Sequence, residues 1–275
     1  MVNKLWVVTS YKTDFSWIDN YTSNYIIYDK SGELQETDRI KHQVNVGYNI
    51  YDLCYFIIKH YDNLPDVCVF IKSNVFKHCN EDKFNILIQN NNFTPIESYE
   101  HLPVSEVHVK GADGGFMEIN NSWYIQSHIN SHGKEVNRFL RTYNQFLRKV
   151  FNNPVYPDWV RFAPGGNYII PKENILFYSK EFYKRLMSYV DYHQIPSEAH
   201  IIERALYTIF TNQFQEKSQM MALSDDIMYW FIDSGKEFFG DVLHWLLSSG
   251  KKIYRKYLPD SIIRIIQRIR NGISR

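Results

Sequence analysis

The feature that most constrains the fold is a series of short apolar runs near the start of the chain, rich in β-branched and aromatic residues. Residues 5–10, 24–29 and 67–71 form such runs, which are too short for helices and are bounded by polar residues. Residues 48–61 carry apolar side chains at helical spacing, and the sequence Asn-Leu-Pro-Asp ends that helix. We therefore expect an α/β fold with a Rossmann-like, mostly parallel central sheet flanked by helices.

The later segments extend this pattern. The elements expected are a loop at 89–92, a strand at 106–109 that runs into a glycine-rich turn at 111–115, a strand at 168–170, and helices at 134–151, 180–190 and 197–212. We predict an α/β domain over residues 1–215 and a C-terminal helical region with a basic amphipathic tail over residues 216–275.

The composition indicates a globular protein of the cytosol. Of the 275 residues, 44% are hydrophobic and 22% are charged. The three cysteines, Cys54, Cys68 and Cys79, fit neither a disulfide framework nor a metal motif. The first ten residues lack the apolar core of a signal peptide, and no window reaches the roughly eighteen apolar residues of a membrane span.

The charge is spread unevenly. Residues 251–275 carry eight lysines and arginines and one aspartate, a net charge of +7, which leaves about −6 for the rest of a chain whose total is +1. This asymmetry argues against nucleic-acid binding by the main domain and predicts an anionic partner for the tail.

Polar side chains follow the expected strands at the edge where parallel sheets bind ligands. They are Thr9, Ser10, Tyr11 and Asp14 after the first strand, Asp29 and Lys30 after the second, and Lys72, Ser73 and Asn74 after the third. Asp14 and Asp29 suit the hydroxyls of uridine or ribose, and Tyr11 suits stacking on a base. Asp14 is equally well interpreted as a cap or turn residue. His78 either contacts a phosphate or is a solvated loop histidine.

Two later segments suggest sugar transfer when they are taken together. Residues 163–172 contain the glycine pair Gly165–Gly166, which allows close approach of backbone to a ligand. Residues 196–204 begin a helix with Pro-Ser-Glu, which fixes a carboxylate at the helix rim. The alternatives are an ordinary turn and an acidic residue that complements the helix dipole.

The run from Val7 to Trp17, together with 27–30, 45–47, 57–70, the glycine pair and Glu203–Arg204, resembles a glycosyltransferase-like family catalogued as a domain of unknown function of the 3431 type. The resemblance covers residues 5–212 and implies a GT-A fold. It further implies that the first half binds a nucleotide sugar and the second half binds the acceptor. The implied donor residues are the strand-end set above without Ser10, joined by Asn45, Gly47 and His78. The implied acceptor residues are Gly165, Gly166, Asn167 and Arg204.

The chain departs from the GT-A pattern at the metal site. GT-A enzymes place Asp-x-Asp after the strand that ends the nucleotide-binding half, and its carboxylates hold Mg²⁺ or Mn²⁺ against the diphosphate. Here the corresponding run is Lys72-Ser73-Asn74. A lysine neutralises a diphosphate directly, so we favour transfer without a metal cofactor. The alternative is that Asp113, or Asp225 with Asp226, supplies the metal from elsewhere.

An inverting transfer needs a carboxylate that takes the proton of the acceptor hydroxyl. Glu198 is the first candidate and Glu203 the second, with His200 beside them. At 100° per residue, His200, Glu203 and Arg204 share a polar helix face opposite the apolar one. The alternative for Glu203 is a local ion pair, and for Glu198 it is an interaction with the helix dipole.

The function expected is therefore glycosyl transfer from a nucleotide sugar to a saccharide or lipid-linked saccharide, as in capsule or lipopolysaccharide biosynthesis. A noncatalytic carbohydrate-binding or polysaccharide-assembly protein is the alternative. In the tail, apolar residues from Leu258 to Ile273 fall on one arc of a helical wheel and arginines on the other. This pattern predicts a helix lying in the plane of an anionic membrane, which would place the protein on the inner face of the membrane.

Overall fold

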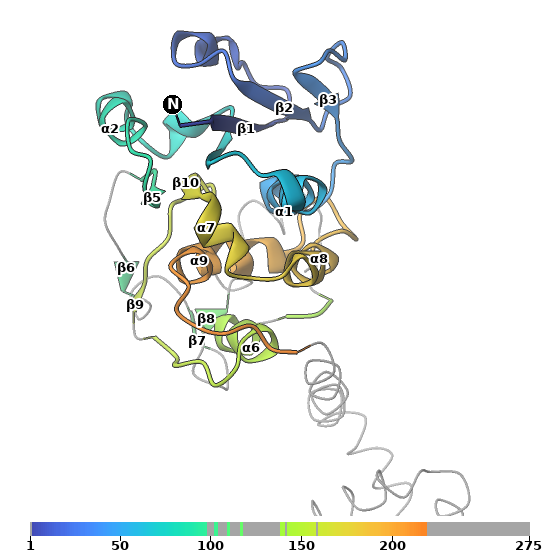
Figure 1. The fold of residues 1–275 in the computed structure, drawn as a ribbon. Coiled ribbons are helices and arrows are strands. Elements are labelled where there is room, and N and C mark those ends of the chain that lie inside the picture. Colours follow the sequence, from blue (N-terminus) through green and yellow to red (C-terminus); the bar gives the residue numbers. More distant parts are fainter. Residues whose placement is uncertain are drawn as a thin grey trace, which may run out of the picture. The chain divides into compact units, whose positions relative to one another are not determined.

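The structure is a computed structural model of the chain. It describes residues 2–97, 138–140, 142–157 and 159–218, together with the backbone of three short strands between 102 and 117. The chain divides into two units, Met1–Lys217 and Ser218–Arg275, and the description that follows concerns the first (Figure 1). The predicted turn at 111–115, Asp113, Asp225, Asp226 and the tail all lie outside the described residues.

A six-stranded sheet forms the centre of the unit, in the order β3-β2-β1-β4-β10-β5. Four neighbouring strands are parallel; β10 is antiparallel to β4, and β5 is antiparallel to β10 and therefore runs in the same direction as the first four. The bounds are β1 Lys4–Ser10, β2 Tyr25–Asp29, β3 Ile40–His42, β4 Val67–Lys72, β5 Thr94–Pro95 and β10 Tyr168–Pro171. Two separate pairs are β6 Leu102–Pro103 with β9 Trp159–Val160, and β7 Val109–Lys110 with β8 Phe116–Met117. The predicted α/β fold with a mostly parallel sheet is confirmed.

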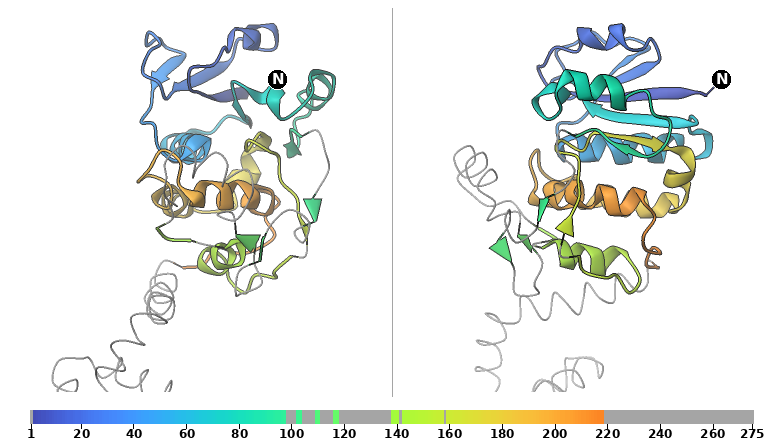
Figure 2. Two further views of the ribbon diagram at one scale, coloured as in Figure 1. Left: turned by 180° about the vertical axis from the view of Figure 1, so that it is seen from behind. Right: turned by 90° about the vertical axis from the view of Figure 1, so that its left-hand side faces the viewer.

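Helices cover both faces of the sheet. One face carries α1 Tyr48–His60, α7 Lys172–Leu176, α8 Lys180–Ser188, α9 Ser197–Phe210 and α6 Tyr143–Val150. The views show α1 nearest the sheet, α8 and α9 in the next layer and α6 beyond them (Figure 2). The other face carries α2 Glu81–Leu87 and the short 3-10 helices η1 Ser16–Asn20 and η3 Val75–Lys77, while η2 Tyr61–Asn63 continues α1.

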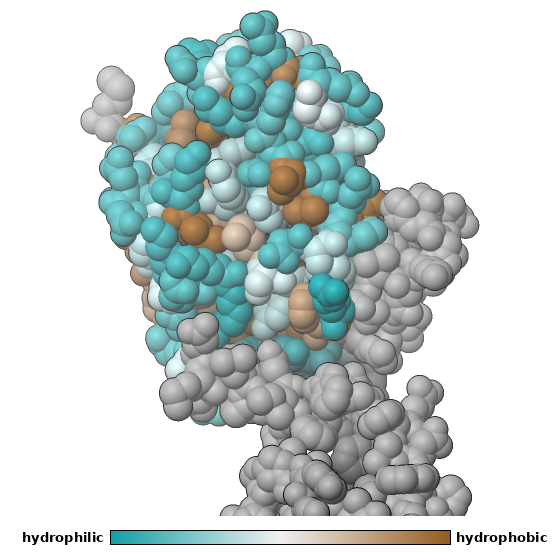
Figure 3. Space-filling model, turned by 90° about the vertical axis from the view of Figure 1, so that its right-hand side faces the viewer, coloured by the Kyte–Doolittle hydropathy of each residue, from teal (hydrophilic) through white to brown (hydrophobic). Residues whose placement is uncertain are grey.

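Alternation along the strands divides the core into two clusters. Val7 and Phe70 face α1, whereas Val8 and Ile71 face η1 and α2. This period of two is what a strand buried on both faces requires. The outer surface next to β3 and α8 is mostly hydrophilic, and its hydrophobic residues form small separate groups (Figure 3).

The strand order creates a switch point between β1 and β4. From β1 the chain passes to β2 on one side, whereas from β4 it passes through α2 toward β5 on the other side. The crevice at the carboxyl ends of two such strands is where open α/β sheets bind ligands. Helices α1 and α9 both begin at this edge of the sheet (Figure 2).

One predicted helix is shorter than expected, and two elements of the structure were not predicted. The helix expected over 134–151 is present only as α6, because residues 138–140 are not helical and Thr142 caps the helix by accepting a hydrogen bond from the Gln145 amide. Strand β3 and helix α2 were not predicted, since β3 contains a single apolar residue and α2 is only seven residues long. Within the described part of the chain, every helix is too short or too polar to traverse a bilayer.

The start of α1 depends on a glycine, and this yields a stability prediction. Gly47 has φ +62, and a Cβ there would lie 2.7 Å from the Val190 carbonyl oxygen. Gly32 has φ +68 with no atom nearby, so it is a control for backbone strain alone. We expect Gly32→Ala to cost about 1 kcal/mol and Gly47→Ala at least about 1 kcal/mol more, measured by urea unfolding. Equal costs would contradict the predicted clash with Val190, which follows α8.

Candidate functional site

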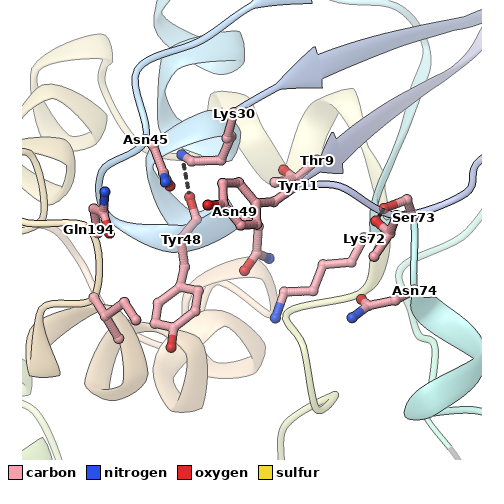
Figure 4. A pocket seen from close by; sticks show the side chains of 12 residues that line it. Thr9, Tyr11, Lys30, Asn45, Tyr48, Asn49, Lys72, Ser73, Asn74 and Gln194 are labelled. Carbon is pink, nitrogen blue, oxygen red and sulfur yellow. Dashed lines mark hydrogen bonds between the residues drawn. The ribbon is translucent and has the colours of Figure 1, made fainter. Parts of the chain in front are cut away.

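A cavity of about 430 Å³ opens at the switch point between β1 and β4 (Figure 4). Its lining comes from the ends of β1, β2 and β4, from the start of α1, and from the segment before α9. The residues are Thr9, Tyr11, Thr13, Lys30, Asn45, Tyr48, Asn49, Lys72, Ser73, Asn74, Gln194 and Ile195. The lining is rich in hydroxyl and amide groups, and none of these residues carries a carboxylate.

The cavity brings together seven of the residues that the sequence indicated. They are Thr9, Tyr11, Lys30, Asn45, Lys72, Ser73 and Asn74. They meet because parallel strands end at one edge of the sheet. Sequence reasoning missed Thr13, Tyr48, Asn49, Gln194 and Ile195, which come from the loop after β1 and the starts of two helices. Two residues of the sequence could have indicated where these helices start: Gly47, which precedes α1, and Pro196, which precedes α9.

Lys72 supplies a cation to the cavity. Its side chain is half-buried, and its ammonium lies 5.5 Å from the centre of the Tyr48 ring. The close-up shows Lys72 and Asn74 extending their nitrogen atoms into the same part of the cavity (Figure 4). Burial lowers the pKa of Lys72, Glu203 offsets part of this decrease, and Arg204 adds to it. Within the described ranges, the ammonium forms no hydrogen bond or ion pair.

Lys30 is held differently, although it also lines the cavity. Its ammonium donates to the carbonyl oxygens of Val46 at 2.7 Å and Tyr48 at 2.8 Å, and to Asp52 Oδ1 at 3.1 Å. An ammonium has three N–H donors, so these acceptors occupy all of them. Asp52 is fully buried and also accepts a hydrogen bond from Thr9 at 2.8 Å. Burial lowers the pKa of Lys30, and Asp52 opposes that shift.

Tyr48, the first residue of α1, has a strained backbone conformation. Its φ is +50, directly after Gly47 at +62. The amides of both residues donate to carbonyl oxygens of His193 and Gln194, while Lys30 binds the carbonyls of Val46 and Tyr48. The Tyr48 ring lies between Lys72 and His200, whose ring centre is 5.2 Å away. A non-glycine residue in this region costs about 1–3 kcal/mol and points to a functional constraint.

The glycine pair forms a turn behind the cavity. Gly165 and Gly166 have φ values of +82 and +64, and the carbonyl of Gly165 accepts a hydrogen bond from the Asn49 amide at 2.8 Å. Asn167 is buried; it accepts from the Lys72 amide and donates to the Pro164 carbonyl. These contacts make the turn a support for β4 and α1, whereas direct binding of an acceptor by these residues stays a prediction.

Four residues of the predicted donor set lie outside the cavity lining. Asp29 is buried and accepts from the Ser31 amide, the Ser31 hydroxyl and the Leu34 amide, and these bonds outweigh burial and lower its pKa. Asp14 is exposed and closes a local turn with Ser16, as its alternative interpretation predicted. Gly47 is the N-cap residue of α1, so it sets the backbone conformation at the start of that helix. His78 lies against Gly165, and burial lowers its pKa.

Glu198 holds the segment of residues 138–140 in place by hydrogen bonds. It is fully buried, and its Oε1 accepts from the amides of Arg138, Phe139 and Leu140 at 2.7, 2.6 and 3.2 Å. Its Oε2 accepts from the Tyr192 hydroxyl at 2.7 Å. A carboxylate with four donors is poorly placed to take a proton from an acceptor hydroxyl, so the geometry favours a structural role over the predicted general base.

The predicted polar face of α9 is buried, contrary to the helical-wheel expectation that it stands clear of the core. Arg204 packs 4.1 Å from the centre of the Phe162 ring, and its Nη1 lies 2.5 Å from Glu203 Oε1. His200 packs on Tyr48. Burial lowers the pKa of both Lys72 and His78, and the charge of Glu203 opposes part of that decrease in each. The local ion pair that was the alternative for Glu203 is thus present.

The described residues contain no group of three or more His, Cys, Asp or Glu side chains placed to hold a metal ion. The donor set around the cavity consists of hydroxyls, amides and ammonium groups. Divalent cations that bind diphosphates prefer carboxylate oxygens, so the described lining does not fit such an ion. Whether Asp113, or Asp225 with Asp226, supplies a metal falls outside the described part.

One family model, described as "Protein of unknown function (DUF3431)", matches residues 5–223 of the chain. Neither a curated protein nor a solved structure matches it. The predicted membership of the DUF3431 family is therefore confirmed. The description of the family assigns no activity, so the likeness to GT-A glycosyltransferases stays a prediction.

The contacts of Glu198 yield a prediction about stability. Glu198→Ala leaves three backbone amides and a tyrosine hydroxyl without their acceptor, so we expect a loss of about 3 kcal/mol in urea unfolding. Hydrogen exchange should quicken at the amides of residues 138–140. Glu181→Ala is the control, since its side chain is 62% exposed, and it should change stability by less than about 0.5 kcal/mol. Unchanged stability and exchange in Glu198→Ala would show that this carboxylate does not anchor the segment.

Proposed function

The chain belongs to the DUF3431 family, whose description states no activity, and we propose that it is a glycosyltransferase that uses a nucleotide-sugar donor. The observation that carries the proposal is the cavity at the switch point of the sheet, into which the ammonium of Lys72 projects. Ligand sites in open α/β folds occur at this position.

The size and lining of the cavity support a ligand with both polar and phosphorylated parts. Its volume of about 430 Å³ falls within the range of small-molecule pockets, roughly 300–1,000 Å³. Hydroxyl and amide side chains such as Thr9, Asn45 and Gln194 suit the hydroxyls of a sugar or a ribose. Tyr11 is 51% exposed at the rim and can stack on a base.

Two positive features support a diphosphate in the same cavity. Lys72 offers an ammonium whose donors no described residue occupies, and the first turn of α1 faces the cavity through Tyr48 and Asn49. A helix N-terminus carries a partial positive charge and favours anions. In this proposal Lys72 neutralises the leaving diphosphate, the role that a metal ion has in GT-A enzymes.

The general base proposed is Glu203. It lies on α9, whose His200 packs on the Tyr48 ring of the cavity lining, and its charge opposes part of the decrease that burial causes in the pKa of Lys72 and of His78. Glu198, the first candidate from sequence, has both carboxylate oxygens bound to other groups. Glu203 would accept the proton of the acceptor hydroxyl as that oxygen forms its bond to the sugar and the nucleoside diphosphate leaves with the bonding electrons.

The acceptor and the location belong to the same proposal. A saccharide or a lipid-linked saccharide would receive the sugar, and the basic tail of residues 251–275 would hold the protein against an anionic membrane surface. The tail lies outside the described residues, so this part of the proposal rests on sequence alone.

The first test is a thermal-shift and calorimetric screen with UDP, GDP, CMP and their sugars. At least one nucleotide diphosphate or nucleotide sugar should raise the melting temperature, by an amount that grows with the logarithm of its concentration above the dissociation constant. Lys72→Met should weaken that binding by roughly 10- to 100-fold, because a charge-assisted contact to phosphate is lost. Lys77→Met is the matched control, since Lys77 is exposed on η3 and does not line the cavity. Binding and transfer should both persist in EDTA.

Three outcomes would count against the proposal. Stabilisation by free oligosaccharides with none by nucleotides would favour the noncatalytic carbohydrate-binding protein. Equal losses in Lys72→Met and Lys77→Met would remove Lys72 from the site. Loss of activity in EDTA with rescue by Mn²⁺ would show that a carboxylate pair elsewhere holds a metal.

A second prediction concerns the general base. Glu203→Gln should lower the rate of transfer by about 10²- to 10⁴-fold and change donor affinity little, since a base acts in the chemical step. Glu173→Gln, an exposed change on α7, is the control and should leave the rate unchanged. Steady-state kinetics and calorimetry measure the two effects separately. A Glu203→Gln variant with full activity would exclude Glu203 as the base.

A further inference from the structure

The two lysines that line the cavity differ in what their ammonium groups contact. Lys30 donates all three of its hydrogen bonds to protein acceptors, and two of these are main-chain carbonyls where the loop after β3 runs into α1, those of Val46 and Tyr48. It therefore has no donor left for a ligand phosphate. A role for Lys30 in the cavity must act through the loop that it binds.

That loop is held from both sides. On one side Lys30 binds the carbonyls of Val46 and Tyr48. On the other side the amides of Gly47 and Tyr48 donate to the carbonyls of His193 and Gln194 at 2.8 and 3.3 Å. Asp52, one turn into α1, completes the arrangement by accepting from both Lys30 and Thr9. The loop is thus tied to β1, β2 and the segment before α9.

The residue held in this way is Tyr48, whose φ of +50 is unfavourable for a side chain with a Cβ. A glycine would adopt the same conformation without strain, but it would supply no ring. Here the ring stands between the Lys72 ammonium at 5.5 Å and the His200 ring at 5.2 Å. If φ of Tyr48 relaxed to a negative value, its ring would leave this position.

We propose that Lys30 and Asp52 are positioning residues for the anion site, which hold Tyr48 in its strained conformation so that its ring orients the ammonium of Lys72 in the cavity. The ring face attracts the ammonium by a cation–π interaction while leaving its N–H donors directed at a ligand. The inference rests on the proposed function only for the identity of the anion, a nucleoside diphosphate.

The experiment compares four variants of the full chain. Lys30→Met with Asp52→Leu removes the ion pair without leaving a buried charge unpaired. Tyr48→Leu removes the ring, and the triple variant combines these changes. Leu53→Ala, a core change in the same helix, is the control for lost stability. UDP and inorganic pyrophosphate are the probes in calorimetry.

We expect the double variant and Tyr48→Leu each to weaken UDP binding about tenfold, and the triple variant to weaken it little further, because both changes remove the same interaction. Leu53→Ala should lower stability and leave affinity unchanged. Additive losses, or an equal loss in Leu53→Ala, would overturn the inference.

A second measurement needs no ligand. With 3-fluorotyrosine placed at position 48, Lys72→Met should shift the fluorine resonance in the native background and should not shift it once Lys30 and Asp52 are replaced. A shift of equal size in both backgrounds would overturn the inference even where UDP binds. If neither UDP nor pyrophosphate binds the native chain but the fluorine result is as expected, the nucleoside diphosphate is rejected as the ligand. The positioning of Tyr48 and Lys72 by Lys30 and Asp52 is then still supported.

Discussion

The buried ion pair between Lys30 and Asp52 is the contact on which the candidate site depends. Lys30 extends from the end of β2, Asp52 lies in the first turns of α1, and Thr9 on β1 binds the same carboxylate. Two charges removed from water cost several kcal/mol each unless their hydrogen bonds are satisfied, and here every ammonium donor has an acceptor. The pair thereby fixes the start of α1 against the carboxyl edge of the sheet, and this position defines the cavity.

The rest of the site follows from that position. The first turn of α1 brings Tyr48 and Asn49 to the cavity, and Asn49 binds the Gly165 carbonyl behind it. Asn167, at the end of the same turn, binds the backbone of Lys72. The segments before α1, after β4 and before β10 are therefore linked around one space. Lys72 enters this space with an ammonium that no described residue binds by a hydrogen bond, whereas the ammonium of Lys30, which follows β2, donates to three protein acceptors.

Much of the fold was predictable because short apolar runs rich in β-branched residues, and the helical spacing of apolar residues in α1 and α9, are local signals. The strand-end residues of the cavity were predictable for the same reason, since parallel strands end together. Asp52 and Glu198 were not, because their roles depend on which distant backbone groups meet them. Asp29 shows most clearly what position alone does not predict. It lies at the end of a strand, yet its carboxylate accepts hydrogen bonds from the amides of Ser31 and Leu34. On the polar face of α9, Arg204 packs on Phe162, a residue distant in sequence that a helical wheel does not include.

The central claim is that the cavity between β1 and β4 binds the diphosphate of a nucleotide sugar. The most direct measurement is a crystal structure of the full chain with the nucleotide sugar that stabilises it most. The account predicts phosphate oxygens within hydrogen-bonding distance of Lys72 Nζ, beside the first turn of α1, with the sugar toward Glu203. A nucleotide bound elsewhere on the molecule, with Lys72 making no contact to it, would contradict the account.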